Sequence, residues 1–216
     1  MEVAASSDEP AAAGGRRSKR YARSPVRPSR LYVVGTRSFA AEVVDFAAET
    51  GLEIAGLLEP FDRNRVGTTI HDLPVTWLEE TGAARALVGT GERSRRLIVG
   101  RLRAAGWTVD GLVHPKAHIA RSSAVGNGAI VAPGVVVGAR SRIGEHVVLG
   151  RGALVGDHTE VGAFATVNPG ANVADNVRIG EDALVGTAAV VGDNVTVGAA
   201  AVVAAGAVVL ADVEAD

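Results

Sequence analysis

Residues 143–167 read IGEHVVLGRGALVGDHTEVGAFATV, with an aliphatic residue at every sixth position: Ile143, Leu149, Val155, Val161 and Val167. The same phase runs without interruption from Ile119 to Val209. Four residues after each aliphatic position stands Ser, Thr, Ala or Val, as at Ser141 and Thr159. A period of six fits neither the 3.6-residue helix nor the short alternation of an ordinary strand. It predicts a parallel β-helix of hexapeptide repeats.

Glycine usually follows the aliphatic position of each hexapeptide, and Asn168 is a polar substitute for it. Glycine enters left-handed backbone conformations without steric cost, so we expect these residues to form the turns between short strands. Low-complexity sequence would not keep two residue classes in phase over so many units, and β-sandwiches have turns at irregular spacings of about 8 to 12 residues. The glycines are Gly126, Gly138, Gly144, Gly150, Gly156, Gly162, Gly180, Gly186, Gly192 and Gly198.

The composition limits the chemistry that the chain can perform. Its 216 residues carry a formal net charge of −2 and no cysteine, which excludes disulfides, a thiolate nucleophile and cysteine-ligated zinc. The sequence has no apolar run long enough to span a membrane and no signal-peptide core. We therefore expect a cytoplasmic protein without a membrane span.

The first thirty residues differ in composition from the rest. Seven basic residues fall within residues 16–30, where there is no acidic residue. They could contact nucleic acid or anionic lipid. Because Ala, Gly, Ser and Pro surround them without a pattern that could be buried, we predict a solvated, disordered leader over residues 1–30 and expect no nucleic-acid partner. The basic residues are Arg16, Arg17, Lys19, Arg20, Arg23, Arg27 and Arg30.

Residues 31–113 alternate between strand and helix patterns. Strands are expected at 31–34, 53–58, 86–88 and 107–113, and helices at 39–50, 77–81 and 93–105. This order predicts a small parallel sheet with helices against it. Ligands bind such sheets beyond the carboxyl ends of the strands, so the loops at 35–39, 59–62 and 89–95 are the candidate binding loops.

The alternating segment, the junction Leu112-Val-His-Pro115 and the hexapeptides together resemble the sialic acid O-acetyltransferase family of sugar O-acyltransferases. The bacterial UDP-amino-sugar N-acetyltransferases share this architecture. The resemblance covers about residues 31–210 and implies an α/β plus all-β fold. A Rossmann-like sugar-nucleotide-binding domain at 31–113 would precede a left-handed β-helix acyltransferase domain at 114–216. It also implies a homotrimer that uses acetyl-CoA and no metal to acylate a hydroxyl or amino group of a sugar or nucleotide-activated sugar.

The resemblance implies two sets of binding residues. Arg37, Ser38 and Phe39 match the family's sugar-nucleotide loop, Glu59 with Pro60 matches its acidic pair, and Gly89, close to Arg95, matches its second glycine loop. Thr166, Thr187 and Ala205 fall where family members contact acyl-CoA. Family members usually continue beyond the last coil into a tail of the Gly-x-Pro-Ala type, for which we expect no counterpart here. The acidic end Asp212-Val-Glu-Ala-Asp216 is therefore expected either to shield the helix edge or to accompany weaker donor binding.

Acyl transfer to an amine or hydroxyl needs a base, and histidine has a suitable pKa. Family members carry His followed by an acidic residue in one outward turn. Here Asp157 stands at the histidine position and His158 at that of the acidic residue. The resemblance implies that His158 is the general base with Asp157 beside it, displaced by one residue from the family's arrangement.

Three alternatives remain open from the sequence. One is a degenerate site, which would make the chain a trimeric binding or scaffold protein. His146, expected to be outward and solvated, could be the base instead. A zinc hydratase on the same helix would need three convergent histidines, and His118, His146 and His158 lack the close pair typical of such enzymes. His71, beside Asp72, is expected at the surface.

Overall fold

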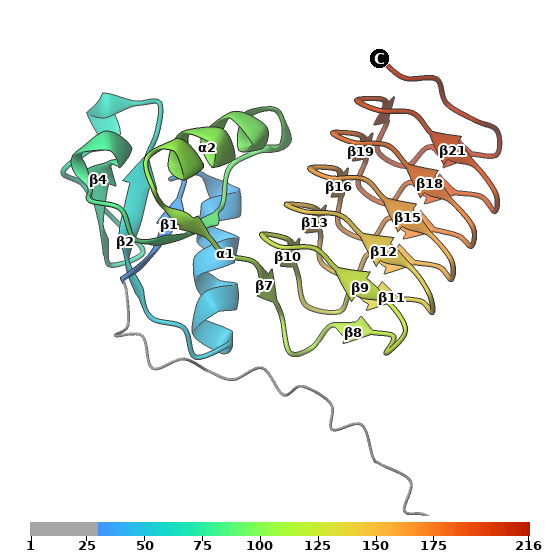
Figure 1. Ribbon diagram of the computed structural model, residues 1–216, viewed down its shortest axis with the longest axis horizontal. Helices are drawn as coiled ribbons and strands as arrows, with labels where there is room; N and C mark the ends of the chain where they lie inside the picture. The colour runs from blue at the N-terminus through green and yellow to red at the C-terminus, as the bar shows by residue number, and fades with distance from the viewer. Residues whose placement is uncertain (1–29) are drawn as a thin grey trace, which may run out of the picture.

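The computed structural model describes residues 30–216, except for the side chains at positions 92 and 93. The predicted leader lies, apart from its last residue, outside the described residues. The chain forms a front domain of sheet and helices, blue to green in Figure 1, beside a stack of short strands, yellow-green to red.

The front domain contains a mostly parallel sheet with the strand order β3-β4-β2-β1-β5-β6. Only β3 pairs antiparallel, through a tight turn to β4. The sequence patterns predicted β1, β2 and β5, but missed the β3–β4 hairpin. The bounds are β1 Leu31–Val34, β2 Ile54–Glu59, β3 Thr69–Ile70, β4 Leu73–Trp77, β5 Arg85–Val88 and β6 Thr108–Val109.

Two helices cover opposite faces of this sheet. Helix α1, Ser38–Glu49, packs Val43 and Phe46 into one core with Val33. Helix α2, Glu92–Ala104, packs Ile98 into a second core with Val34. Neighbouring residues of β1 serve different cores because successive side chains of a strand point to opposite faces. Both helices begin within one residue of the predicted position, whereas the predicted helix at 77–81 is only a 3₁₀ turn, Leu78–Glu80; a second 3₁₀ turn covers Arg63–Arg65.

The single strand predicted at 107–113 is wrong. The chain breaks after β6, and β7, Leu112–Val113, pairs with β10 of the hexapeptide region. The interruption falls at Asp110-Gly111, where a side chain at Gly111 would lie 2.7 Å from the carbonyl oxygen of Ala129. The first strand of the hexapeptide region therefore precedes His114, whose buried imidazole lies 3.0 Å from a carboxylate oxygen of Glu49 in α1.

The hexapeptide region forms three parallel sheets of six, six and five strands, in which paired residues are eighteen apart, as in Ile130↔Val148. This arrangement fits a left-handed β-helix. The first face contains β7, β10 Ile130–Val131, β13 Val148–Leu149, β16 Thr166–Val167, β19 Leu184–Val185 and β22 Val202–Val203. The second face contains β8 His118–Ile119, β11 Val136–Val137, β14 Leu154–Val155, β17 Asn172–Val173, β20 Val190–Val191 and β23 Val208–Val209. The third face contains β9 Ala124–Val125, β12 Arg142–Ile143, β15 Glu160–Val161, β18 Arg178–Ile179 and β21 Thr196–Val197.

Both predicted inward positions face the interior of the β-helix. Val155 and Val161 of the aliphatic register and Thr159 of the second register are buried. Each face is joined to the next by a four-residue corner. We name the corners by the faces they join: first–second (such as 168–171), second–third (such as 156–159) and third–first (such as 144–147).

The glycines lie in the corners between strands, as predicted, but the left-handed conformation expected of them is wrong. Gly144 has no left-handed backbone; that conformation occurs two residues later, at His146, with φ 56°. Glycine is favoured at position 144 for another reason, since a Cβ there would lie 2.7 Å from the backbone nitrogen of Ala163 in the next coil. The left-handed position also accepts His158 (φ 54°) and Phe164 (φ 61°), so it is fixed by the corner and not by the residue type.

Candidate active site

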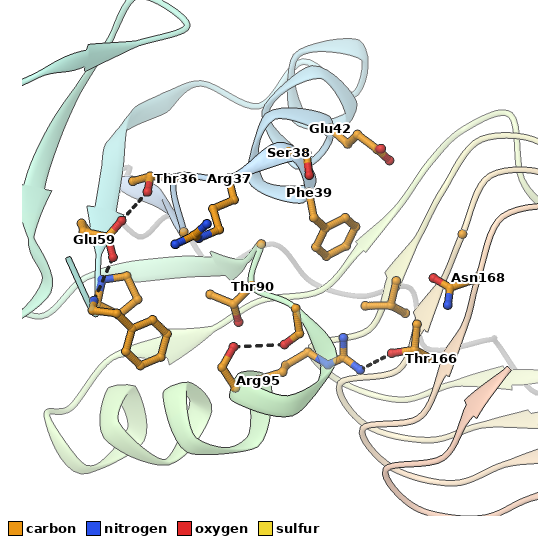
Figure 2. A pocket seen from close by; sticks show the side chains of 18 of the residues that line it. Thr36, Arg37, Ser38, Phe39, Glu42, Glu59, Thr90, Arg95, Thr166 and Asn168 are labelled. Atoms are coloured by element: carbon orange, nitrogen blue, oxygen red, sulfur yellow. Dashed lines mark hydrogen bonds between the residues drawn. The ribbon is translucent and has the colours of Figure 1, made fainter. Parts of the chain in front are cut away.

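A cavity of about 430 Å³ lies between the carboxyl ends of β1, β2 and β5 and the first face of the β-helix. All five residues predicted to bind the substrate line it. Thr166, predicted to contact acyl-CoA, lines it from the other domain (Figure 2). The lining residues used below are Arg37, Ser38, Phe39, Glu42, Glu59, Pro60, Phe61, Gly89, Thr90, Ser94, Arg95, Thr166, Asn168 and Pro169.

Glu59 shapes the cavity wall instead of presenting a free carboxylate. One carboxylate oxygen accepts hydrogen bonds from the backbone nitrogens of Phe61, at 2.8 Å, and Asp62, at 3.1 Å. The other accepts the hydroxyl hydrogen of Thr36, as Figure 2 shows. Buried carboxylates need such partners. Glu59 thus ties the loop after β2 to the loop after β1.

Gly89 permits a close approach of two backbone segments. A Cβ at this position would lie 2.8 Å from the Cα of Ala40 in α1, a distance that real Cβ atoms do not show. Gly35 faces it with φ 122°, and a Cβ there would lie 2.7 Å from the carbonyl oxygen of Gly89. The two glycines bring the amino ends of both helices to the same cavity.

Arg95 of α2 connects the cavity to the β-helix. It is 2% exposed, and its Nη2 donates to the carbonyl oxygen of Phe164, at 2.6 Å, and to the hydroxyl oxygen of Thr166, at 2.7 Å. Figure 2 shows the contact with Thr166. A buried guanidinium needs several acceptors, and these come from the other domain. Arg95 therefore holds the two halves of the cavity together.

Thr187 and Ala205, the other predicted acyl-CoA residues, lie outside the cavity. Both are exposed on the first–second corner, one and two coils beyond Pro169, which lines the cavity. Successive coils lie about 4.8 Å apart. The two residues therefore continue a straight line that leaves the cavity along this corner.

His158 and Asp157 lie on a different edge of the β-helix from the cavity. Both are exposed on the second–third corner. One six-residue side of the coil, roughly 20 Å of extended chain, separates this corner from the first–second corner. Asp157 Oδ1 accepts a hydrogen bond from the backbone nitrogen of Ala139, at 2.6 Å. Within residues 30–216, no hydrogen bond or ion pair joins His158 to Asp157.

His146 is not solvated, contrary to expectation. It is 1% exposed, its ring stacks on Phe164 with centroids 4.9 Å apart, and Nε2 lies 2.9 Å from Nη2 of Arg103 in α2. Burial, followed by the charge of Arg103, lowers the pKa of the imidazole, while nearby Glu145 acts in the opposite direction. The side chain packs between the domains and does not line the cavity.

The histidines considered for a zinc site do not converge. His118 lies on the second face, His158 on the second–third corner and His146 on the third–first corner. Among the described residues, no three His, Asp or Glu side chains come close enough to hold a metal ion. His71 and Asp72 form the exposed β3–β4 turn, with φ of 52° and 59°.

Sequence patterns missed two features of the cavity. The hydroxyl of Thr90 is buried and has no hydrogen-bond partner among the described residues. Phe61 lines the cavity with 55% of its surface exposed. A role for Phe61 could have been predicted, because it is an aromatic residue directly after the predicted binding pair Glu59-Pro60. Burial of the Thr90 hydroxyl could not, because it depends on tertiary packing.

Known proteins with this fold include sugar acetyltransferases. A variant of perosamine N-acetyltransferase from Caulobacter crescentus, in complex with CoA and GDP-perosamine, is 27% identical, with a TM-score of 0.81 over 89% of this chain and 94% of that chain. The acetyltransferase domain of PglB from Neisseria gonorrhoeae is 30% identical, with a TM-score of 0.77 over 86% of this chain and 93% of that chain. A second structure of that domain contains acetyl coenzyme A.

The comparison with protein families matches residues 109–214 to the GMPPB C-terminal domain, which corresponds to the hexapeptide region. No curated protein matches the sequence. In the described part of the chain, neither helix has the length and apolar character needed to cross a membrane.

Proposed function

We propose, because this chain belongs to the hexapeptide-repeat acetyltransferase family, that it transfers an acetyl group from acetyl-CoA to an amino group of a nucleotide-activated sugar. The observation that carries the proposal is the cavity shared by the two domains. The acceptor would lie in the front domain, residues 31–113, and the β-helix, residues 114–216, would position the donor. We propose an amino group as the acceptor because the similar perosamine enzyme is an N-acetyltransferase. A hydroxyl acceptor, as in sialic acid O-acetyltransferases, is the alternative.

The charge at the cavity suits an anionic acceptor. Helices α1 and α2 both direct their amino ends to it, through Ser38 and Ser94, and free backbone N–H groups at helix starts bind phosphates. Arg37 adds a positive charge and has no ion-pair partner among residues 30–216. A sugar linked to a nucleoside diphosphate carries the negatively charged phosphates that the helix starts and Arg37 would bind.

The donor would follow the first–second corner. Thr166 lies inside the cavity, and Thr187 and Ala205 continue the line outside it. An acetyl-CoA lying along this corner would place its thioester near Thr166 and extend its long pantetheine arm past the exposed residues. The proposal includes no metal ion.

We propose that the site is completed by a second copy within a homotrimer. The second face exposes four aliphatic side chains, Val136, Leu154, Val190 and Val208, of which Leu154 is 41% and Val190 37% accessible, beside the polar His118 and Asn172. Such a face on a soluble protein marks an association surface. One edge of this face carries the cavity and donor line, and the other carries His158. Cyclic packing through this face places the first–second corner of one copy beside the second–third corner of its neighbour.

In this arrangement His158 serves the neighbouring copy's cavity. Its imidazole removes the proton from the acceptor amine as the nitrogen attacks the thioester carbonyl. The new C–N bond forms, the C–S bond breaks, and the CoA sulfur leaves and takes up a proton. Asp157 contributes indirectly by fixing the corner through its hydrogen bond to Ala139.

A second candidate function is that of a trimeric binding protein without catalysis. It is favoured by Asp157, which occupies the family's histidine position and is engaged with the backbone. Asp175 and Asp193 repeat this contact in the next two coils, accepting from the backbone nitrogens of Asp157 and Asp175 at 2.8 and 3.0 Å. The carboxylate of Asp157 thus follows a structural repeat of the corner.

The decisive experiment measures thiol release from acetyl-CoA with a panel of UDP-, GDP- and dTDP-linked amino sugars. We expect release with at least one acceptor, together with a product heavier by one acetyl group. Stability of the product in mild base separates an amide from an ester. Binding of CoA without thiol release for any acceptor, including hydroxyl sugars, would favour the binding protein.

A further inference from the structure

Phe61 is an aromatic ring exposed at the wall of a binding cavity. Its residue surface is 55% accessible, and it lines the cavity with Glu59 and Pro60. Phe46 and Phe164 are buried and Phe39 is half-buried, so Phe61 is the one exposed phenylalanine among residues 30–216. Leaving such a ring in water forgoes the free energy gained by burial. A bound planar group would recover part of it.

The backbone that carries Phe61 is held on both sides. Buried Glu59 accepts its N–H at 2.8 Å and that of Asp62 at 3.1 Å. Arg101 of α2 donates to the carbonyl oxygen of Pro60 at 3.2 Å and is itself paired with Glu79. The Arg101 guanidinium also lies over the phenyl ring, 5.9 Å from its centroid. The ring is therefore positioned before any ligand binds, which lowers the entropy cost of stacking on it.

The strand order places Phe61 at one end of a row of binding groups. The loop after β2 carries Phe61, the start of α1 follows β1, and the start of α2 follows β5, in the sheet order β2-β1-β5. In Figure 2, Glu59 lies at one end of the cavity and Thr166 and Asn168 lie at the other. The starts of the two helices thus stand between Phe61 and the β-helix.

One buried polar group in the middle of the row, the hydroxyl of Thr90, has no hydrogen-bond partner among the described residues. Thr90 stands after β5 at the start of α2, and the residue is 7% exposed. A buried hydroxyl without a hydrogen bond is costly, so a ligand that reaches the space between the helix ends gains by pairing with it. This position suits a phosphate or sugar oxygen.

We propose that Phe61 stacks on the nucleobase of the acceptor and is the residue by which the enzyme selects nucleotide-linked sugars. The inference rests on the proposed function for the identity of the acceptor. It adds the order of the parts: base on Phe61, diphosphate at the helix starts near Arg37 and Thr90, and sugar towards Thr166. An amino sugar 1-phosphate, which lacks the base, would miss the first of these contacts.

The test is direct binding of UDP, GDP, CDP and dTDP by calorimetry without CoA, for wild type, Phe61→Ala and Phe61→Trp. Base stacking on an aromatic side chain predicts that Phe61→Ala raises the Kd of the best nucleotide roughly 5- to 150-fold. Phe61→Trp should keep the affinity, and the new indole should show fluorescence quenching on binding. Because Phe61 is exposed, the melting temperature should not change.

Leu97→Ala is the matched control, because Leu97 of α2 is 58% exposed and lies outside the cavity. It should bind nucleotides as wild type does. In turnover, Phe61→Ala should raise KM for the nucleotide sugar and leave kcat/KM for the sugar 1-phosphate unchanged, an outcome that general damage to the site would not give.

The inference is overturned if wild type binds none of the four nucleotides, or if Phe61→Ala binds them as tightly as wild type does. It is also overturned if Phe61→Ala weakens the base-free acceptor to the same extent. Normal Phe61-dependent nucleotide binding without acetyl transfer would count against the proposed function alone, so the two failures are distinguishable.

Discussion

His146 is an imidazole buried between the two domains, where burial and the charge of Arg103 lower its pKa. Its ring lies between Phe164 and the guanidinium of Arg103, with Glu145 beside it and Arg95 nearby on α2. Arg96 covers the adjacent ring of Phe164 at 4.2 Å. A proton on this imidazole would add a positive charge to a site that already faces two arginines. Protonation of His146 is therefore unfavourable where α2 meets the β-helix.

We therefore expect the folded protein to lose stability at acidic pH because of His146. The pKa of His146 is lowered in the folded state, so below the ordinary histidine value of about 6.5 the unfolded chain binds the proton more readily. The stability contribution is complete above that value and declines as the pH falls towards the folded pKa. Melting temperatures measured from pH 7.5 to 5.5 should decrease more for wild type than for His146→Asn, since asparagine tolerates the left-handed backbone. Equal decreases in the two proteins would contradict this role.

The corners of the β-helix share one backbone conformation but differ in the atoms that surround it. Gly128 and Gly152 both adopt the left-handed conformation, with φ of 72° and 65°. A Cβ at Gly128 would lie 2.1 Å from Nδ1 of His146, whereas a Cβ at Gly152 would meet no atom within 4 Å. Substitutions at Gly152 and Gly128 therefore distinguish the cost of backbone strain alone from the cost of strain together with a steric clash.

Gly152→Ala should cost about 1–2 kcal/mol of unfolding free energy, the price of a left-handed alanine. Gly128→Ala should cost clearly more, because the methyl group must displace the imidazole that packs against α2. Urea unfolding of the two variants measures the difference. Equal losses would show that His146 moves at no cost.

The sequence predicted those elements whose pattern is local. The six-residue phase placed both inward registers, and helical spacing placed α1 and α2 within one residue at their starts. The break at Asp110-Gly111 and the burial of His146 were missed because both depend on a neighbouring coil or helix. The loops of the cavity were predicted, since they follow strands of a parallel sheet. The position of His158 on a different edge from the cavity was not predicted, because it follows from the three-sided shape of the coil.

For the whole molecule, the proposed trimer would pack through the second face of the β-helix. Leu154 stands at the middle of this face with 41% exposure, and Thr196 is exposed on the third face. Leu154→Arg should give monomers by light scattering, with loss of transfer, because a charge at an apolar contact is left unpaired. Thr196→Arg, which adds the same charge elsewhere, should remain trimeric and active. A trimeric Leu154→Arg variant would exclude this face as the interface.

The most direct test of the account is subunit complementation. Arg37→Glu should inactivate the cavity by repelling an anionic acceptor, and His158→Ala should remove the base. If each site joins the cavity of one copy to His158 of its neighbour, an equimolar mixture with randomly exchanged subunits should recover about a quarter of the wild-type thiol release, because one interface in four of the whole population pairs an intact cavity with an intact His158. Mixed trimers that show only the summed activity of the two variants, or a wild type that releases no thiol, would contradict the account.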